Sequence, residues 1–177
     1  MPRIPYPKGA SELPAVQAGG VRTLNVERIL YHLPDNLRQE MGALGKSLLW
    51  RGSLNPVYRE LALVRVGRLS KSAYEVHHHE AYARTFGISE DQLDRLRSGD
   101  FSSGFTAAEC AVLEFTDDVA INVRPSDKSL TTIQKYLSNG EIMELILAFG
   151  FYMTLCRILE TFDPELDSFT MTPIARD

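Results

Sequence analysis

The sequence predicts an all-α protein, and three observations lead to this fold class. Apolar residues recur three and four positions apart along most of the chain, which is the spacing of a helix with one buried face. Serine or threonine stands directly before several of these segments, where it can cap a helix N-terminus. No segment shows convincing two-residue alternation between hairpin turns, which a β-strand would require.

The helical part follows an N-terminal stretch that is rich in proline and glycine. Residues 1–25 hold four of the nine prolines, so they are expected to form an extended arm. The remaining residues, 26–177, are expected to form a single helical domain, because 177 residues suffice for one hydrophobic core.

About seven helices are expected in this domain, and all of them follow the helical spacing of apolar residues. The first begins near Pro34 and ends before Gly52, and the others span about 57–69, 72–86, 91–98, 107–122, 127–137 and 140–161. Gly87 follows the third of them and suits a left-handed C-terminal cap.

Four later helix starts carry capping signals. Ser89, Thr106 and Ser138 each stand three residues before a glutamine or glutamate, the spacing of a capping box, and Ser126 is a simpler cap.

Composition and charge narrow the class of function. A net charge of -4 without a basic run argues against a nucleic-acid partner. The longest apolar stretch, 142–155, is shorter than a membrane span and contains Glu144, so no membrane partner is expected. The N-terminus lacks the apolar stretch of a secretory signal, which favours a cytoplasmic protein. Cys110 and Cys156 lie in separate helical patterns, and we expect two buried free thiols.

The most unusual segment of the chain is Ser72–Glu80, which contains three consecutive histidines. On a helix Glu75 lies beside both His78 and His79, and Ser72, Glu75 and His79 share one stripe. A carboxylate that holds an imidazole raises its basicity, which gives a general base near neutral pH.

A second acid lies one helix earlier, at Glu60. It would approach the same site if the two helices form an antiparallel hairpin over the turn 70–72. Three nearby arginines are candidates to hold a substrate carboxylate: Arg59, Arg65 and Arg68.

Other interpretations of these residues remain open. Ser72 and Glu75 have the spacing of a capping box, which is compatible with a Glu75–His79 contact. A glutamate and a histidine on one helix face are also common without any function. A metal site built on Glu75 and His79 would lack both the H-E-x-x-H pattern and a defined third ligand, so no metal is predicted.

Residues 59–69, the Tyr-Glu-x-x-His-His pattern at 74–79 and Gly87-Ile88-Ser89 together resemble the carboxymuconolactone decarboxylase superfamily, which includes the AhpD-like (alkylhydroperoxidase-D-like) proteins. The resemblance is specific over about residues 55–100. It implies an all-α fold that assembles into homotrimers or homohexamers, with the site near a subunit interface.

The resemblance also assigns chemistry to positions. The peroxidase branch of the superfamily uses a glutamate, a C-x-x-C pair and a histidine, which correspond to Glu60, Ser72, Glu75 and His79 here. Both sulfur atoms are missing, so thiolate attack on a peroxide has no nucleophile at this place. The chain therefore resembles a cysteine-free branch.

The resemblance implies a decarboxylase-like enzyme that needs no cofactor and acts on a small carboxylated lactone or a related acid. The expected site comprises catalytic and substrate-binding residues: Glu60, Glu75 and His79 for catalysis, and Ser72, His78 and Arg68 for the substrate. Two alternatives are a peroxidase-related antioxidant protein and a non-catalytic ligand-binding homologue.

Overall fold

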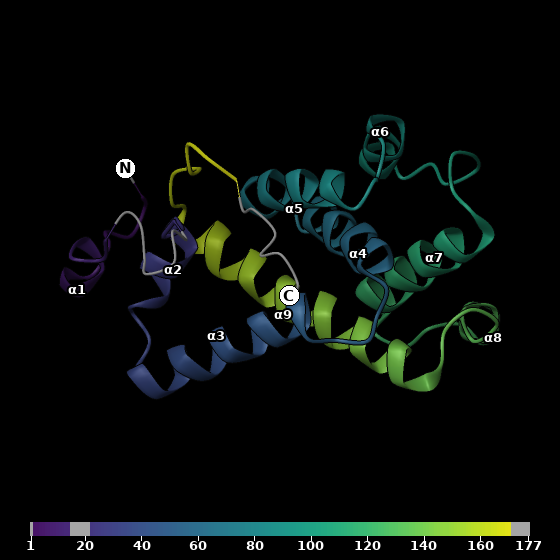
Figure 1. Ribbon diagram of the computed structural model, residues 1–177, viewed down its shortest axis with the longest axis horizontal. Coiled ribbons are helices and arrows are strands. Elements are labelled where there is room, and N and C mark those ends of the chain that lie inside the picture. The colour runs from purple at the N-terminus through teal and green to yellow at the C-terminus, as the bar shows by residue number, and fades with distance from the viewer. Residues whose placement is uncertain (1, 15–21, 171–177) are drawn as a thin grey trace.

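The structure is a computed structural model that describes residues 2–14 and 22–170 (Figure 1). In these ranges all regular structure longer than one residue is helical, which confirms the predicted all-α class. Residues 15–21 of the expected arm and the last seven residues lie outside the described part.

The described ranges contain nine helices, of which the last seven correspond to the predicted ones. They are α1 (Lys8–Ser11), α2 (Asn25–Leu30), α3 (Asp35–Trp50), α4 (Pro56–Leu69), α5 (Ala73–Thr85), α6 (Glu90–Ser98), α7 (Ala107–Asn122), α8 (Asp127–Ile133) and α9 (Asn139–Phe162). The two short helices that the prediction lacks, α1 and α2, belong to the proline-rich start of the chain.

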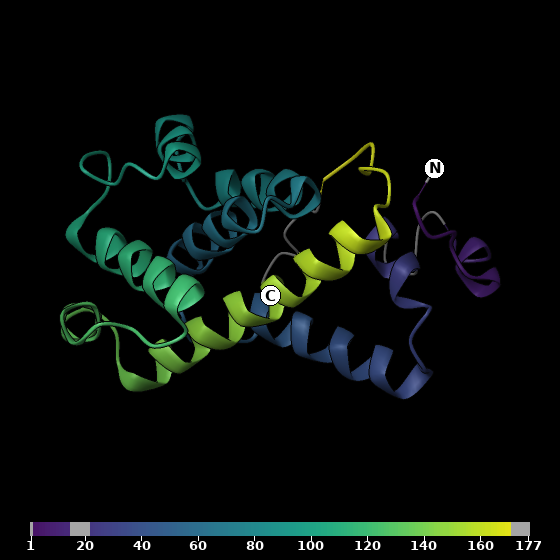
Figure 2. The ribbon, with the colours of Figure 1, turned by 180° about the vertical axis from the view of Figure 1, so that it is seen from behind.

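Helix α9 runs diagonally across the molecule (Figures 1 and 2). Helix α3 runs along one side of it and the α4–α5 hairpin lies on the other, while α6 and α7 pack against α4 and α8 packs against α7. Helix α4 is central, since it packs against α5, α6, α7 and α9. Its apolar residues Leu61, Ala62 and Val64 are fully buried as a result.

Most of the predicted caps are present in the structure. Ser89, Thr106 and Ser138 form capping boxes, and the Ser126 hydroxyl accepts a hydrogen bond from the backbone N–H at position 129. Gly87 has the predicted left-handed conformation, with φ of +85°.

The interpretation of Ser72 and Glu75 as a capping box is wrong. Ser72 is the N-cap residue of α5, but its hydroxyl makes no cap hydrogen bond. Both side chains are buried, at 0% and 5% exposure, and turn toward the protein interior.

The predicted hairpin between α4 and α5 is confirmed. Lys71 in the turn has a φ of +56°, which reverses the chain within three residues. Near this turn Gly67 lets the two helices approach closely: a β-carbon there would lie 3.1 Å from Val76 Cγ2 and 3.6 Å from Glu75 Cβ.

Helix α9 is longer than the apolar stretch expected from the sequence. An 18-residue window within its 24 residues has a mean hydropathy of 1.8, so length and composition alone would allow it to cross a membrane. A core helix passes the same test, and 44% of that window is buried inside the molecule. Glu144 anchors it to the α3–α4 loop by accepting hydrogen bonds from Ser53 N (2.9 Å), Ser53 Oγ (2.9 Å) and Leu54 N (3.1 Å).

The described terminal segments pack against each other. Ile4 N donates to the carbonyl of Phe162 at 3.2 Å, and Arg28 of α2 donates to the carbonyl of Ala10 at 2.7 Å. Part of the expected arm is therefore docked on the domain, and Ala10 is fully buried.

Candidate active site

The centre of the site is His79, a fully buried histidine between two carboxylates. Its Nδ1 lies 2.8 Å from Glu60 Oε2, and its Nε2 lies 3.4 Å from Glu75 Oε2. Glu60 comes from α4, whereas Glu75 and His79 stand one turn apart on α5. The hairpin therefore brings together the three residues that were expected to be catalytic.

Arg59 extends this cluster on the side of α4. Its Nε donates to Glu60 Oε1 at 2.8 Å, so each oxygen of Glu60 has its own partner. The Arg59 side chain is only 2% exposed. Two buried carboxylates beside one guanidinium leave an excess negative charge unless His79 is protonated.

The charges around His79 change its expected protonation state. Burial lowers the pKa of this imidazole, but Glu60 and Glu75 outweigh burial and raise the pKa to about 9. At neutral pH His79 is therefore a cation with a proton on each nitrogen. A protonated His79 can donate a proton, whereas the sequence spacing suggests a neutral histidine that acts as a base. Glu75 is the carboxylate that faces its Nε2.

Helix α9 contributes Tyr152, which the sequence analysis did not identify. Its ring meets the His79 ring edge-on, with centroids 4.5 Å apart. Burial raises the pKa of Tyr152 well above its usual value, and the charges of Glu75 and Glu60 raise it further. The phenol keeps its proton and can only donate a hydrogen bond to a developing negative charge. A hydroxyl on the otherwise apolar, buried stripe of α9 is the signal that could have revealed it.

Cys156 follows Tyr152 by one turn on α9 and lies at the edge of the cluster. It is a free, buried thiol, as predicted, whereas Cys110 is only half-buried. Burial raises the pKa of the Cys156 thiol to about 12, and the nearby hydroxyls of Ser70 and Ser72 offset only part of this effect. The fully buried Ser72 hydroxyl has no hydrogen-bond partner.

A small surface pocket opens next to this thiol. It has a volume of about 220 Å³ and is lined by Ser70, Cys156, Arg157 and Glu160. The charge of Glu75 acts on Cys156, and Cys156 is the residue that relates this pocket to the cluster.

His78, expected to bind substrate, has a different partner. Its Nε2 lies 3.1 Å from Asp167 Oδ2, and the same carboxylate accepts hydrogen bonds from the Tyr74 hydroxyl and from Asn25 N. This buried network fastens the C-terminal segment and α2 to α5. The structure therefore does not bring His78 together with Glu60.

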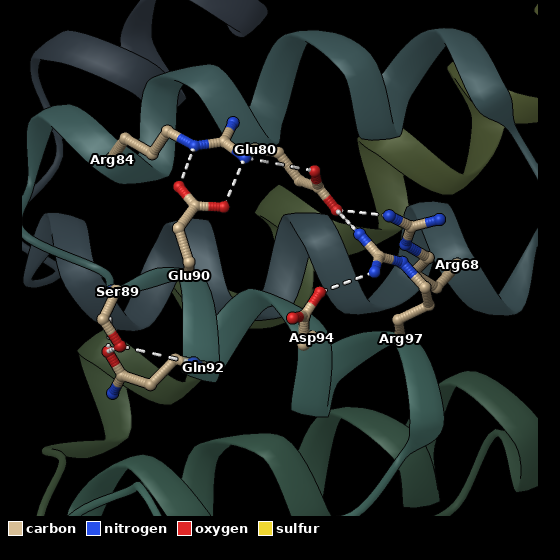
Figure 3. A network of polar contacts seen from close by, with 8 residues as sticks. All are labelled: Arg68, Glu80, Arg84, Ser89, Glu90, Gln92, Asp94 and Arg97. Carbon is tan, nitrogen blue, oxygen red and sulfur yellow. Dashed lines mark hydrogen bonds and ion pairs between the residues drawn. The ribbon is translucent and has the colours of Figure 1, made fainter.

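Arg68, the other expected substrate ligand, belongs to a surface network (Figure 3). It donates to Glu80, whose carboxylate also lies 3.7 Å from Arg84 and 3.8 Å from Arg97. Arg84 and Arg97 reach two further carboxylates of α6, those of Glu90 and Asp94. These ion pairs join α4, α5 and α6 away from His79.

The third arginine of α4 is also committed to another partner. Arg65 makes two hydrogen bonds to Asp117, of 2.6 and 2.7 Å, and a third to the carbonyl of Leu96. As for metals, the described part of the chain contains no group of three or more histidine, cysteine or acidic residues that could hold an ion.

The fold and the site together define an all-α protein with a buried carboxylate–imidazole–carboxylate cluster on a helical hairpin. Residues 36–118 match the Carboxymuconolactone decarboxylase family, a range that includes Glu60, Glu75 and His79. With the fold comparisons below, this match supports the resemblance: residues 36–118 are similar to the carboxymuconolactone decarboxylase family, and the chain has the fold of AhpD-like proteins. A comparison with curated proteins gave no match.

Solved structures show the same fold at low sequence identity. The alkylhydroperoxidase AhpD core of an uncharacterized peroxidase-related protein from Ralstonia eutropha JMP134 superposes with a TM-score of 0.79 at 18% identity, covering 95% of this chain and 93% of that one. A protein of unknown function from Agrobacterium tumefaciens, described as an AhpD antioxidant defence protein, gives 0.71 at 23% identity and covers 78% and 95%. The debrominase Bmp8 in complex with 2,3,4-tribromopyrrole gives 0.70 at 14% identity and covers 82% and 78%.

Proposed function

We propose that this protein is a cofactor-free acid/base enzyme that acts on a small carboxylated lactone or a related acid. The observation that carries the proposal is the buried Glu60–His79–Glu75 array. Three titratable groups are held together without exposure to bulk water, and the pKa of His79 is raised to about 9. The family match supports the decarboxylase class, and we propose the specific activity and the substrate class on the basis of the site.

Each residue of the array has a distinct role in this proposal. Glu60 holds Nδ1 of His79 and fixes the ring, so Glu60 is a positioning residue. His79 Nε2–H is the proton donor, and Glu75 is the acceptor on the same side. The 3.4 Å separation between them is longer than a normal hydrogen bond, so a substrate atom that binds Nε2–H has no such hydrogen bond to break.

The proposed reaction begins with the loss of CO2 from the substrate. The C–C bond to the carboxylate breaks, and its electron pair passes into an enolate next to the lactone carbonyl. His79 Nε2–H then protonates this enolate at carbon, and neutral His79 regains its proton from solvent. The protonated Tyr152 phenol stabilises the enolate oxygen by donating a hydrogen bond.

The experiment that tests this proposal is a CO2-release assay on a panel of small carboxylated lactones that includes a carboxymuconolactone. We expect Glu75→Gln and His79→Gln each to lower kcat by about 10²- to 10⁴-fold, because His79 donates the proton and Glu75 helps to keep His79 protonated. Glu80→Gln is the matched control, since Glu80 is adjacent in sequence and pairs with surface arginines. Full activity in both site variants would overturn the proposal.

A thiol peroxidase activity would require a thiolate near His79. Cys156 is influenced by Glu75 of the same cluster, but a thiol with a pKa of about 12 is hardly ionised at neutral pH. We therefore expect no hydroperoxide turnover with a dithiol reductant. Turnover that disappears in Cys156→Ser but not in Cys110→Ser would favour the peroxidase-related alternative instead.

We also propose that the protein works as a cytoplasmic homo-oligomer. Apolar residues on α9 are exposed, namely Met143 (64%) and Leu147 (52%), and on α3 Leu37 is 50% exposed. A second copy of the chain would cover such faces, and two free cysteines fit a reducing compartment. Light scattering coupled to size exclusion checks the assembly, and a monomeric mass would contradict it.

A further inference from the structure

The Arg59 guanidinium is a buried cation whose hydrogen-bonding capacity is largely unused. Its side chain is 2% exposed, and Nε makes one bond, to Glu60. Its Nη2 is buried and has no hydrogen-bond partner. A buried charged donor without a partner costs more than the roughly 1–3 kcal/mol of a neutral one. Such a group calls for a specific explanation, such as a catalytic or ligand-binding role.

A second unused donor belongs to the same cluster. His79 Nε2 is buried and makes no hydrogen bond, and Glu75 is its nearest carboxylate, at 3.4 Å. Glu60 connects the two cations, because Oε1 accepts from Arg59 and Oε2 contacts His79. One carboxylate therefore holds a guanidinium and an imidazolium side by side, each with an unpartnered N–H donor.

We infer that Arg59 is the anchor for the carboxylate of the substrate, with Nη2 as the donor. The inference rests on the proposed function and names the residue that selects the anionic substrate class. Arg65 and Arg68 were the other candidates on α4, and the structure commits them to Asp117 and Glu80. Arg59 alone of the three lies in the cluster of Glu60, His79 and Tyr152, where its charge lowers the pKa of the Tyr152 phenol.

The net charge of the cluster does not repel an added anion. With His79 protonated, Arg59 and His79 balance Glu60 and Glu75, and the buried cluster is neutral. A monocarboxylate brings a single negative charge to two unpartnered donors, whereas a neutral amide of the same shape brings none. Carboxylates should therefore bind more tightly than their amides, and a charge-assisted bond to a guanidinium is the stronger kind.

Trp50 provides a way to measure this binding without any turnover. It is the only tryptophan of the chain, and its indole N–H donates to the Tyr82 hydroxyl at 2.8 Å. The Tyr82 ring in turn lies 6.5 Å from the His79 ring, edge-on. Occupation of the cluster should thus change the fluorescence of Trp50.

The test titrates the full-length protein at pH 6 with formate, acetate and benzoate, and in parallel with formamide, acetamide and benzamide. We expect at least one carboxylate to give a saturable change in Trp50 fluorescence that its amide does not give. Arg59→Lys should weaken that binding about tenfold or more, because the lysine loses the fork of donors. Arg65→Lys is the matched control and should change the Kd less than about twofold.

A second variant keeps the test decisive if Arg59→Lys does not fold. Glu60→Gln removes the negative charge next to Arg59 without removing volume, so carboxylate binding at pH 6 should become tighter. Three outcomes would overturn the inference. The first is an equal Kd for wild type and Arg59→Lys, and the second is unchanged or weaker carboxylate binding in Glu60→Gln. The third is the absence of saturable carboxylate binding by wild type. If carboxylates bind through Arg59 but no CO2 is released from any substrate, the proposed reaction is refuted and the anchor is not. If CO2 is released and Arg59→Lys binds carboxylates as wild type does, the anchor is refuted and the reaction is not.

Discussion

Two ionic networks lie next to each other on helix α5 and differ in their burial. The first contains Glu60, His79 and Glu75, whose side chains are at most 6% exposed. The second surrounds Glu80, the neighbour of His79, and includes Arg84 and Arg97, which are 43% and 54% exposed (Figure 3). Both use glutamates with basic partners and raise the pKa of one such partner, Arg84 in the exposed network and His79 in the buried one. Only the buried network changes a protonation state near neutral pH, because arginine is charged there in any case and an ordinary histidine is mostly neutral.

The comparison shows why adjacent residues of similar chemistry have separate roles. One step along a helix turns a side chain by about 100°, which takes His79 into the core and Glu80 toward the surface. The Glu80 side chain is 12% exposed and its arginine partners are 26–54% exposed, so water screens their charges in part, whereas it hardly reaches those around His79. A pKa of about 9 is therefore found on the buried histidine.

The largest expected difference between the two networks is in the free energy of unfolding. Glu60→Ala leaves Arg59 and His79 buried without their carboxylate, and we expect a loss of about 3–5 kcal/mol. Glu80→Ala removes a surface partner and should cost about 1 kcal/mol or less. Urea unfolding of both variants measures the difference. Equal losses would mean that the two networks do not differ in effective burial.

The pH dependence of stability should show the next largest effect. The folded-state pKa of His79, about 9, lies above its unfolded value of about 6.5, so its contribution is complete below pH 6.5 and lost as pH rises through 9. The shift corresponds to at most about 3 kcal/mol. Unfolding curves between pH 6 and pH 10 should show this decline in wild type and lose it in His79→Gln.

His32→Gln is the control for that experiment. His32 contacts the carbonyl of Pro5 near the N-terminal segment, far from the buried carboxylates along the chain. Its removal should leave the decline between pH 6.5 and pH 9 intact. A decline that persists in His79→Gln would assign it to another group.

The smallest effect is expected from salt. At 1 M NaCl the screening length is about 3 Å, so the surface network should contribute almost nothing and Glu80→Gln should become indistinguishable from wild type. The change is expected to stay below about 1 kcal/mol. The loss caused by Glu60→Ala should persist at the same salt concentration, because the ions do not reach a buried cluster.

The sequence predicted the parts of this protein that depend on local spacing. Helical periodicity and capping residues such as Ser89 and Ser138 located the seven main helices. The short turn at 70–72 predicted the hairpin, and the hairpin placed Glu60 beside His79. These inferences needed only residues that lie within about 20 positions of one another.

The remaining features depend on contacts between distant segments. Tyr152 meets His79 across 73 positions, and Asp167 meets His78 across 89, so no spacing rule could pair them. Arg59 rather than Arg68 lies in the buried cluster because of the direction in which each side chain leaves α4. The sequence does not show this direction, because α4 is buried on nearly every side. Ser72 makes no cap hydrogen bond although its spacing predicted one, because packing against other segments encloses its hydroxyl in the core.

The close packing of α4 and α5 at Gly67 limits which residues this position can accept. Gly67 lies two helical turns after Glu60, on the same face of α4, and a β-carbon there would lie 3.1 Å from Val76 Cγ2 of α5. An alanine at this position therefore fits only if Val76 gives way by a few tenths of an ångström. A shift of α5 in response would change the 2.8 Å contact between Glu60 and His79, so substitution at Gly67 is a way to alter the site while leaving every titratable group in place.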